Sequence, residues 1–446
     1  MISRLSLKDI AWSYLAQFLN IGSGIIIIPL AVKYLSSEDM GLWYLFIAMA
    51  GLAQLLEFGF QPTISRMVSY VYSGAKNLKA EGVPESSEKI NYQLLYDLIN
   101  ASKWIYRYVA LGVAFILMCL GTFYLSQFEE FKRDQVISWL IFSIATVFNF
   151  YFTYFNGLII GKGSQSVLYR ITATSKLLML FTSIPLLVYN YGLISMALGT
   201  LVSLVFTRSL LYIHFNDMKK KDIRALSKIQ SVKSSQVGTV WRSAWKLGVT
   251  SLGAFLILRA NQFISSSYLG LNVAGSYGLT IQLIGILSSV SSMYFMLNIP
   301  KITSLQSNKN KSEMISIVRK SYFVVNFVYI FGCLAIVFIG LPILDYLDAN
   351  TKLVSLSLLL IMFFMYALEL NHSISATFLT TLNQVPFLYA SIVSGFSVVA
   401  ISLLVVNFTT FGILGIVFGQ FFVQALYNNW YWPLRVWMFL RNETQN

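Results

Sequence analysis

The sequence has few of the residues that usually build catalytic and metal sites. Its 446 residues include two histidines and two cysteines. Cys119 and Cys333 fall in different apolar segments, which supports neither a disulfide framework nor a cysteine-rich metal site. There is no Gly-Lys-Ser/Thr phosphate-binding loop, no His/Cys cluster with metal-ligand spacing and no nucleophile elbow. We therefore expect no cofactor, no metal and no ATP hydrolysis, and we do not expect an enzyme.

Charged side chains are also scarce, at 11% of residues, whereas 57% are hydrophobic and the mean hydropathy is +0.67. This composition excludes an ordinary soluble domain. A helix needs about 20 apolar residues to cross the hydrocarbon of a bilayer. We predict an all-α integral membrane protein with twelve transmembrane helices, near residues 10–32, 40–61, 104–126, 136–158, 168–189, 192–213, 243–268, 273–297, 321–341, 353–380, 386–407 and 411–434. The first segment is too long for a signal peptide, and we expect a retained helix.

Acidic residues are outnumbered by basic ones, 18 to 32, for a net charge of +14. The basic residues lie at the two ends of the chain or in and beside the even-to-odd connections, except for Lys33, Lys132, Arg133, Lys352 and Arg259. The positive-inside bias then places both termini in the cytoplasm. We interpret the basic charge as a topology signal with contact to anionic membrane lipids, and we expect no nucleic-acid partner.

The two halves of the chain resemble each other, which predicts an internal duplication. With an offset of 234 residues, the Tyr-Leu pair and the glycines of residues 34–51 fall on those of residues 268–285. With an offset of 220 residues, the run 192–199 falls on 412–419, and both runs begin and end with glycine. Because each half would hold an even number of helices, the halves would be related by an axis along the membrane normal. The expected parts are an N-terminal six-helix lobe at 1–213, a basic cytoplasmic linker at 214–240 and a C-terminal six-helix lobe at 241–446.

The segment 256–287 places an arginine, Arg259, within an otherwise apolar run. A charge at the centre of a bilayer helix costs about 2.5–3.5 kcal/mol on insertion scales, so it is retained where it faces a wet cavity or a fixed partner. In an unbroken helix, Ser251, Phe255, Gln262 and Ser266 would share a face with Arg259. We predict that this face looks inward and that Arg259 contacts the substrate, with a structural ion pair as the alternative.

Further cations are expected along the same path through the bundle. Lys176 and Arg208 lie within spans nearer the cytoplasm, and Arg66, Arg242 and Lys246 lie at the cytoplasmic mouth. A guanidinium binds phosphate or carboxylate bidentately, and lysine offers a mobile point charge. Together they predict a cationic central cavity for an anionic substrate. A structural ion pair is the alternative for Lys176, and a topology or lipid-facing role is the alternative for the three residues at the mouth.

Uncharged polar side chains recur at helical spacing in several predicted spans. We expect them to line the cavity: Asn20, Asn149, Asn156, Asn261, Gln262 and Gln424. Two acids, Glu57 and Glu369, also lie within spans, and Tyr366, Glu369 and His372 can share a helix face. Each acid is either the partner of a cation or a proton or sodium site. Glu369, His372 and Glu57 are therefore candidates for ion coupling.

The segment 256–287, the run WYLFIAMAGLAQLLEFGFQPTISR at 43–66 and the duplication together resemble bacterial polysaccharide flippases. These are the Wzx-type O-antigen flippases of the MATE-like multidrug/oligosaccharidyl-lipid/polysaccharide exporter superfamily. The resemblance implies two six-helix lobes around a cavity in the bacterial inner membrane. It implies transfer of an undecaprenyl-diphosphate-linked glycan of O-antigen or lipopolysaccharide biosynthesis from the cytoplasmic to the periplasmic leaflet by alternating access. It also implies partners among other membrane proteins of polysaccharide assembly.

Within this resemblance, the pattern of the seventh helix maps onto Leu258, Arg259, Asn261 and Gln262. Asn261 stands where an acid is frequent in the family, which leaves Arg259 freer to meet an anion.

Two other functions stay open at this point. A MATE-type drug or cation antiporter of the same fold predicts an acid-dominated cavity, whereas basic residues outnumber acidic ones within these spans. A membrane-embedded polysaccharide polymerase usually needs a sizeable external loop to hold its acceptor, whereas the outward connections are short.

Overall fold

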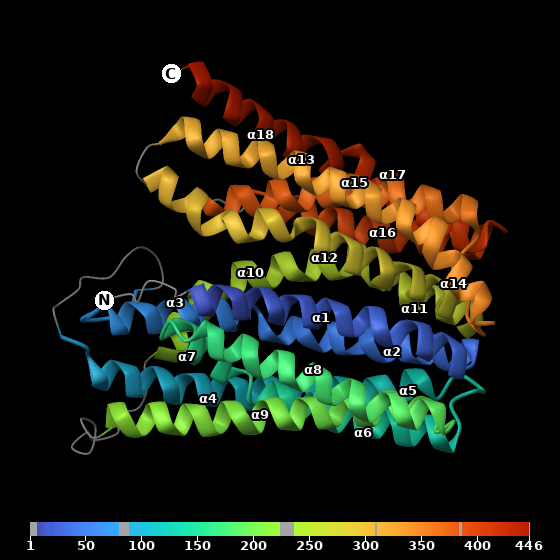
Figure 1. Cartoon of the computed structure of the whole chain (residues 1–446), viewed down its shortest axis with the longest axis horizontal. Coiled ribbons are helices and arrows are strands. Elements are labelled where there is room, and N and C mark those ends of the chain that lie inside the picture. Colours follow the sequence, from blue (N-terminus) through green and yellow to red (C-terminus); the bar gives the residue numbers. More distant parts are fainter. Residues whose placement is uncertain (1–6, 80–88, 224–235, 308–309, 383–385, 446) are drawn as a thin grey trace. The chain divides into compact units, whose positions relative to one another are not determined.

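The computed structural model describes residues 7–79, 89–223, 236–307, 310–382 and 386–445, with the exception of some side chains such as those of Asn20 and Lys246. Within these ranges all of the elements are helices, as Figure 1 shows. The predicted all-α class is confirmed. The chain divides into two compact units, which are described separately below.

Unit 1 comprises residues 1–30 and 49–251. Its helices, some of which extend beyond these limits, are α1 (Leu7–Tyr34), α2 (Ser37–Gln54), the 3-10 segment η1 (Leu55–Glu57), α3 (Phe60–Tyr72), α4 (Tyr92–Ala114), α5 (Thr122–Leu125), α6 (Arg133–Tyr151), α7 (Tyr154–Gly161), α8 (Gln165–Val188), α9 (Leu193–Ile223) and α10 (Gln236–Leu258). α9 packs against both α6 and α8, and α7 packs against α3. These contacts bring polar side chains of α6, α7 and α9 together.

Unit 2 comprises residues 31–48 and 252–446. Its helices are α11 (Ala260–Leu269), α12 (Leu271–Ser307), α13 (Lys311–Ala335), α14 (Leu341–Tyr346), α15 (Leu356–Thr381), α16 (Leu388–Phe408), α17 (Gly412–Leu426) and α18 (Asn428–Gln445). α12 packs against α11, α13 and α15, and α15 packs against α18.

Residues 31–48 belong to unit 2 because they pack closely on its helices. A Cβ atom added at Gly41 would collide with the carbonyl group of Leu271, so the absence of a side chain allows the close approach. Asn350 donates from its backbone N–H to the Val32 carbonyl at 2.8 Å. It also donates from Nδ2 to the Lys33 carbonyl at 2.9 Å.

The compact units therefore differ from the predicted lobes at 1–213 and 241–446. Residues 31–48 fall in unit 2, and the helix after the predicted linker remains in unit 1 as far as residue 251. Part of the predicted linker 214–240 is helical, because α9 continues to Ile223 and α10 begins at Gln236. Residues 224–235 of that linker lie outside the described residues.

Nine helical segments within the described residues are long and apolar enough to cross a membrane. The predicted number of twelve stays a prediction. In α1 only a shorter apolar part, Gly22–Tyr34, is found, and the segments predicted at 243–268 and 411–434 are interrupted at Arg259 and Tyr427.

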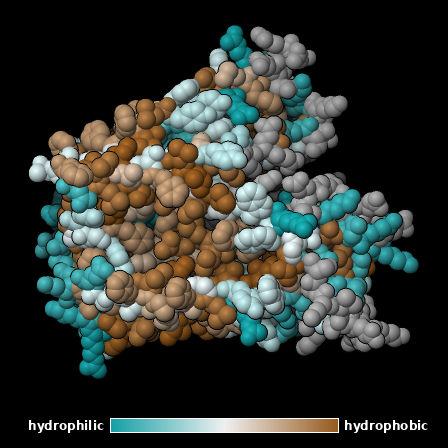
Figure 2. Space-filling model, turned by 180° about the vertical axis from the view of Figure 1, so that it is seen from behind, coloured by the Kyte–Doolittle hydropathy of each residue, from teal (hydrophilic) through white to brown (hydrophobic). Residues whose placement is uncertain are grey.

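Many large apolar side chains point outward from these helices. Phe123, Phe181, Phe323 and Phe338 are each at least 70% exposed. Figure 2 shows such apolar side chains covering the middle of one face, with hydrophilic side chains at its edge. Contact with lipid tails accounts for this pattern, because apolar side chains are stable against hydrocarbon without being buried in protein.

A wide helical turn occurs at a matching place in both units. The π-helical segment η2 (Phe115–Gly121) joins α4 to α5, and the π-helical segment η3 (Ile336–Gly340) joins α13 to α14. π-helical turns are rare and usually single. The separation between the two segments is close to the 220-residue offset of the repeated glycine runs, which supports the duplication.

Candidate functional site

At four places in the chain, a helix is interrupted within an apolar stretch of the sequence. Phe58 and Gly59, between α2 and α3, have positive φ angles of 45° and 72°. Phe152 separates α6 from α7, Arg259 separates α10 from α11, and Tyr427 separates α17 from α18. An interrupted helix leaves backbone groups that lipid cannot satisfy, so such breaks need polar neighbours, and in transporters they commonly lie at binding sites.

Arg208 of α9 is directed at the break between α6 and α7. Its side chain is 5% exposed. Nε donates to Asn149 Oδ1 at 2.9 Å, Nη1 to Asn156 Oδ1 at 2.9 Å and Nη2 to Thr153 Oγ1 at 3.0 Å. Nη1 also lies 3.4 Å from the carbonyl oxygen of Phe152. We call Arg208 and these four partners the Arg208 cluster.

Glu57 lies in a second polar group of unit 1 that adjoins the Arg208 cluster. Tyr106 of α4 donates its hydroxyl to Glu57 Oε1 at 2.8 Å, and Gln54 Nε2 donates to Oε2. The backbone N–H of Gln61 supplies a further hydrogen bond, and Arg208 is close enough for electrostatic attraction. Asn156 Nδ2 reaches Gln61 Oε1 at 3.4 Å, which links the two groups. Glu57 is thus an acidic side chain within electrostatic range of the buried guanidinium, and the described residues show no ion pair within 4 Å between the two.

These contacts favour a structural role for Arg208, Asn149 and Asn156, which the sequence suggested as cavity-lining residues. A guanidinium has five N–H donors, and the four partners of Arg208 accept hydrogen bonds from most of them. The same contacts satisfy the backbone and side chains at the α6–α7 break. The cluster therefore stabilises an irregular helix inside unit 1.

The predicted continuous face through Ser251, Phe255, Arg259, Gln262 and Ser266 is wrong, because the helix is interrupted. Arg259 has φ −127° and is the N-cap residue of α11. Its side chain is exposed, whereas those of Gln262 and Ser266 are buried. Within the described part of the chain, no carboxylate oxygen lies within 4 Å of the Arg259 guanidinium.

Asn261 and Gln262 are buried next to this exposed cation. Asn261 Nδ2 donates to Gln420 Oε1 of α17 at 2.9 Å, and Asn261 Oδ1 accepts from Ser402 Oγ of α16 at 2.8 Å. Gln262 Nε2 donates to the Ala274 carbonyl of α12 at 3.0 Å. Both amides therefore hold α11 against its neighbours, while Arg259 itself is left facing outward from unit 2.

Two buried tyrosines complete the surroundings of Arg259. Tyr277 of α12 lies beside Asn261, and Tyr366 of α15 lies beside Gln420. Both phenol groups are within electrostatic range of the Arg259 guanidinium. The side chains near the Arg259 guanidinium thus include tyrosine rings and the amides that contact them.

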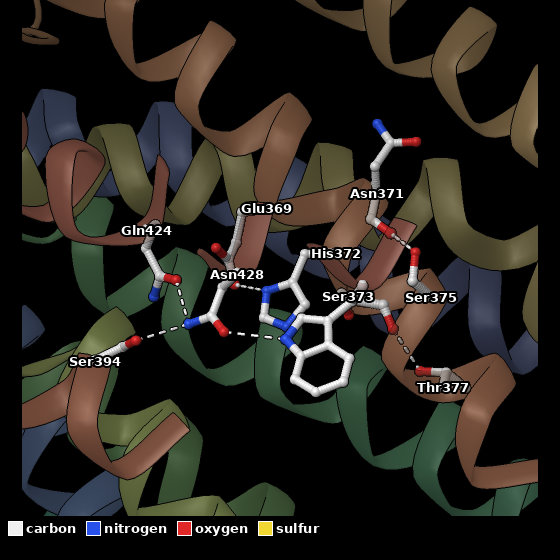
Figure 3. Close-up of polar contacts among 10 residues, drawn as sticks. Glu369, Asn371, His372, Ser373, Ser375, Thr377, Ser394, Gln424 and Asn428 are labelled. Atoms are coloured by element: carbon white, nitrogen blue, oxygen red, sulfur yellow. Dashed lines mark hydrogen bonds and ion pairs between the residues drawn. The ribbon is translucent and has the colours of Figure 1, made fainter. Parts of the chain in front are cut away.

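A further polar group lies at the break between α17 and α18 (Figure 3). Asn428 Nδ2 donates to Ser394 Oγ and to Gln424 Oε1, both at 2.8 Å, and Asn428 Oδ1 accepts from Trp432 Nε1 at 3.0 Å. We call these four residues the Asn428 cluster. The amide nitrogen of Gln424 is buried and, among the described residues, has no hydrogen-bond partner.

Glu369 and His372 pair with each other on α15, as their spacing predicted. His372 Nδ1 lies 3.3 Å from Glu369 Oε1, and their side chains are 13% and 18% exposed, respectively. Figure 3 shows this pair drawn with the Asn428 cluster, and α15 packs against both α17 and α18. The pair places an acid and an imidazole next to helices that are interrupted at Tyr427.

The remaining predicted residues are scattered. Lys176 of α8 is partly buried, and Arg66 of α3 and Arg242 of α10 are exposed. The side chains of Asn20 and Lys246 lie outside the described residues. The predicted central cavity stays a prediction. Among the described residues, His, Cys, Asp and Glu form no group of three or more that could hold a metal ion.

Sequence reasoning missed several partners in these clusters. Tyr106, Ser402, Ser394 and Trp432 hold key polar atoms, yet each lies far in sequence from at least one residue of its cluster. Serine and tyrosine are common in apolar helices, so nothing local distinguishes these residues from others.

Solved structures are similar to this chain in fold. One is an inward-facing multidrug resistance MATE family transporter of the MOP superfamily, with a TM-score of 0.60, 14% identity and 96% of each chain covered. Another is the MATE multidrug transporter DinF-BH, with a TM-score of 0.65, 13% identity and coverage of 99% of this chain and 98% of that one. The chain has the fold of the MATE transporters.

A third similar structure is a MOP superfamily transporter from Pyrococcus furiosus. It has a TM-score of 0.53 and 12% identity, and the match covers 100% of this chain and 96% of that one. A reverse polarity of its binding pocket suggests a different function for that protein. No protein-family profile and no curated protein sequence matches this chain. Together with the apolar helices, the fold makes this chain a multi-pass membrane protein.

Proposed function

We propose that this chain is a flippase for an undecaprenyl-diphosphate-linked oligosaccharide. It would move an O-antigen or related polysaccharide repeat unit from the cytoplasmic to the periplasmic leaflet of the bacterial inner membrane. The MATE fold supports transport by alternating access. The single observation that carries the proposal is Arg259, an exposed cation at a helix break with no carboxylate within 4 Å among the described residues.

The chemistry of Arg259 fits a diphosphate. A guanidinium presents paired N–H donors that match two phosphate oxygens, and such charge-assisted bonds are about twice as strong as neutral ones. Arg259 also stands at the start of α11, where the helix dipole favours negative charge. Asn261 and Gln262 hold α11 in place, so the cation is positioned by a rigid element. Lys176 is proposed as a second cation for the anionic headgroup.

Substitution of Arg259 tests the proposal. In cells that depend on this chain for surface polysaccharide, we expect Arg259→Gln to lower polysaccharide strongly, Arg259→Lys to retain part of it and Arg259→Glu to abolish it. Arg133→Gln, which removes an exposed cation elsewhere, is the matched control. Normal surface polysaccharide with Arg259→Glu, at equal protein abundance, would contradict the proposal.

A MATE-type antiporter of drugs or other lipophilic cations is the second candidate. It is favoured by the similarity in fold to multidrug transporters and by the acids Glu57 and Glu369. Binding measurements on the purified protein separate the two functions. Saturable binding of the lipid-linked glycan that weakens in Arg259→Gln supports the flippase. Saturable binding of a lipophilic cation that weakens in Glu369→Gln, without glycan binding, supports the antiporter.

We place ion coupling, in either case, at the Glu369–His372 pair. The Glu57 carboxylate accepts hydrogen bonds at both oxygens, whereas the Glu369 and His372 side chains contact each other and make no other hydrogen bond or ion pair among the described residues. Transport by reconstituted protein should depend on a proton or sodium gradient, and Glu369→Gln should remove that dependence while Glu57→Gln retains it. The opposite result would move the coupling site to Glu57.

A further inference from the structure

Unit 2 carries an apolar groove with a single charged residue in its lining. The groove encloses about 610 Å³ between α13, α15 and α18. Its wall on α18 includes Trp430, Pro433, Leu434 and Trp437, and the only charged side chain in its lining, all of which is described, is Arg319 of α13. A volume in the range of about 300–1,000 Å³ is typical of small-molecule sites.

Unit 1 carries a groove of the same kind between α4 and α6. It encloses about 580 Å³, and its walls include Ala110, Leu111, Ala114 and Phe148. Arg107 of α4 is the only charged side chain in the lining, which again lies wholly within the described residues. Each unit thus has a groove whose lining includes a single arginine and which lies beside a helix leading into a π-helical turn.

The charge-free runs that follow both arginines indicate a position near the phosphate groups of a membrane. Residues 108–128 and 321–344 contain no charged side chain, and each run is about the 20 residues needed to cross the hydrocarbon. Arg107 directly precedes the first run, and only Lys320 separates Arg319 from the second. Each arginine therefore marks the boundary between hydrocarbon and lipid headgroups, on the side that the charge distribution predicts to be cytoplasmic.

The two guanidinium groups are available to a ligand. Both side chains are exposed, and among the described residues neither makes an ion pair or a hydrogen bond through its side chain. Lys320, next to Arg319, instead lies over the ring of Tyr294, 5.9 Å from its centre. Arg319 is therefore the only charged residue that lines the groove of unit 2, all of whose lining is described.

We propose that each groove holds an acyl chain of an anionic phospholipid whose phosphate binds Arg107 in unit 1 and Arg319 in unit 2. The mostly apolar walls, which in unit 2 also include Tyr322, Asn371 and Asn429, suit an acyl chain. The guanidinium matches the phosphate in charge and in hydrogen-bond geometry. Trp437 lines the groove of unit 2, and tryptophan is enriched at the headgroup level of membranes. These lipids are resident partners, independent of the transported substrate.

Native mass spectrometry of the purified full chain with added phosphatidylglycerol or phosphatidylcholine tests this assignment. We expect two tightly retained phosphatidylglycerol molecules and weaker retention of phosphatidylcholine. Arg107→Gln and Arg319→Gln should each weaken one site by about fivefold, the effect of one basic residue near an anionic surface, and the double variant should weaken both. Lys320→Gln and Arg133→Gln are controls with the same change in charge and should retain both lipids.

Equal retention of the two lipids by the unaltered chain would overturn the proposal, as would two undiminished phosphatidylglycerol molecules in the double variant. Filling the groove provides a second measurement that leaves the arginines in place. Ala114→Phe should remove the lipid of unit 1 while unit 2 keeps its own. Retention of both lipids in a folded Ala114→Phe protein would show that the acyl chain does not lie in the groove of unit 1. That result would also overturn the proposal.

Discussion

The Arg208 cluster of unit 1 and the polar groups around Asn428 in unit 2 occupy matching positions but differ in chemistry. The repeat offset of 220 residues pairs Arg208 with Asn428 and Asn149 with Glu369. In unit 1 a buried cation is surrounded by amides, a hydroxyl and a backbone carbonyl. In unit 2 an amide takes the place of the cation, and an acid paired with His372 takes the place of an amide.

This difference indicates different roles for the two clusters. We expect the cluster in unit 1 to stabilise the fold and the polar groups in unit 2 to respond to ions. The donors of Arg208 are used within unit 1, and Glu57 lies within electrostatic range, so that cluster has little capacity for a ligand. In unit 2 the Gln424 amide nitrogen lacks a partner among the described residues, and the Glu369–His372 pair is partly accessible to solvent. The comparison predicts that Arg208 and Glu57 in unit 1 maintain the fold and that the Glu369–His372 pair in unit 2 responds to ions.

The largest expected effect on stability is that of Arg208→Ala. Removing the guanidinium leaves three polar side chains and a backbone carbonyl without their buried partner. Each unsatisfied buried polar group costs about 1–3 kcal/mol, so the loss should add up over several groups. Unfolding in detergent, followed by circular dichroism, measures the loss. Arg133→Ala, an exposed control, should change stability by no more than about 0.5 kcal/mol. Equal stability of the two variants would contradict a structural role for the cluster.

Asn428→Ala should have the next largest effect. It removes three hydrogen bonds and leaves the Trp432 indole and Ser394 without partners in a buried site. An unsatisfied buried polar group costs about 1–3 kcal/mol, so the loss should be smaller than that for Arg208. Unfolding measurements under the same conditions test the order. Asn407→Ala, at an exposed asparagine, is the control. If Asn428→Ala lowered the free energy of unfolding more than Arg208→Ala, the Asn428 cluster would be the more important one for stability, contrary to our expectation.

The interaction energy between Arg208 and Glu57 tests whether both residues stabilise the fold of unit 1 as one network. A double-mutant cycle with Arg208→Gln and Glu57→Gln should give an interaction energy of about 0.5–3 kcal/mol, because the two groups belong to one network. A second cycle with Arg133→Gln in place of Arg208→Gln should be additive. Additivity in the first cycle as well would mean that Glu57 does not interact with the buried cation.

Glu369→Gln should have the smallest effect on stability and the clearest effect on ion dependence. The pair with His372 is partly solvent-accessible, and such pairs contribute about 0–1 kcal/mol. The proton or sodium dependence of transport in reconstituted vesicles should nevertheless disappear. A variant that unfolds as readily as Arg208→Ala would show that the acid of unit 2 is structural too.

The sequence predicted which polar residues lie inside apolar helices, but not which of them meet. Arg208, Asn149 and Asn156 were visible because any polar group in an apolar run is conspicuous. Their mutual contact depends on how α9 rotates against α6 and α7, which helical spacing within one segment does not determine. The pair Glu369 and His372 was predictable because residues three apart on a helix are neighbours.

The helix breaks show a similar limit. Gly59 gives a local signal for the break between α2 and α3, because glycine adopts positive φ without strain. Neither Arg259 nor Tyr427 has proline or glycine beside it, and the apolar period there favoured continuous helices. Those breaks depend on tertiary contacts, such as those of Asn261 and Asn428, which periodicity does not reveal.

The paired π-helical turns carry a consequence for the history of the chain. An irregular turn of this type at corresponding places is far more simply inherited once than acquired twice. The predicted duplication therefore implies that a single ancestral half contained the wide turn before the gene doubled. At positions 208 and 428 the halves now differ as arginine and asparagine, and at positions 149 and 369 as amide and acid, whereas both halves keep the wide turn.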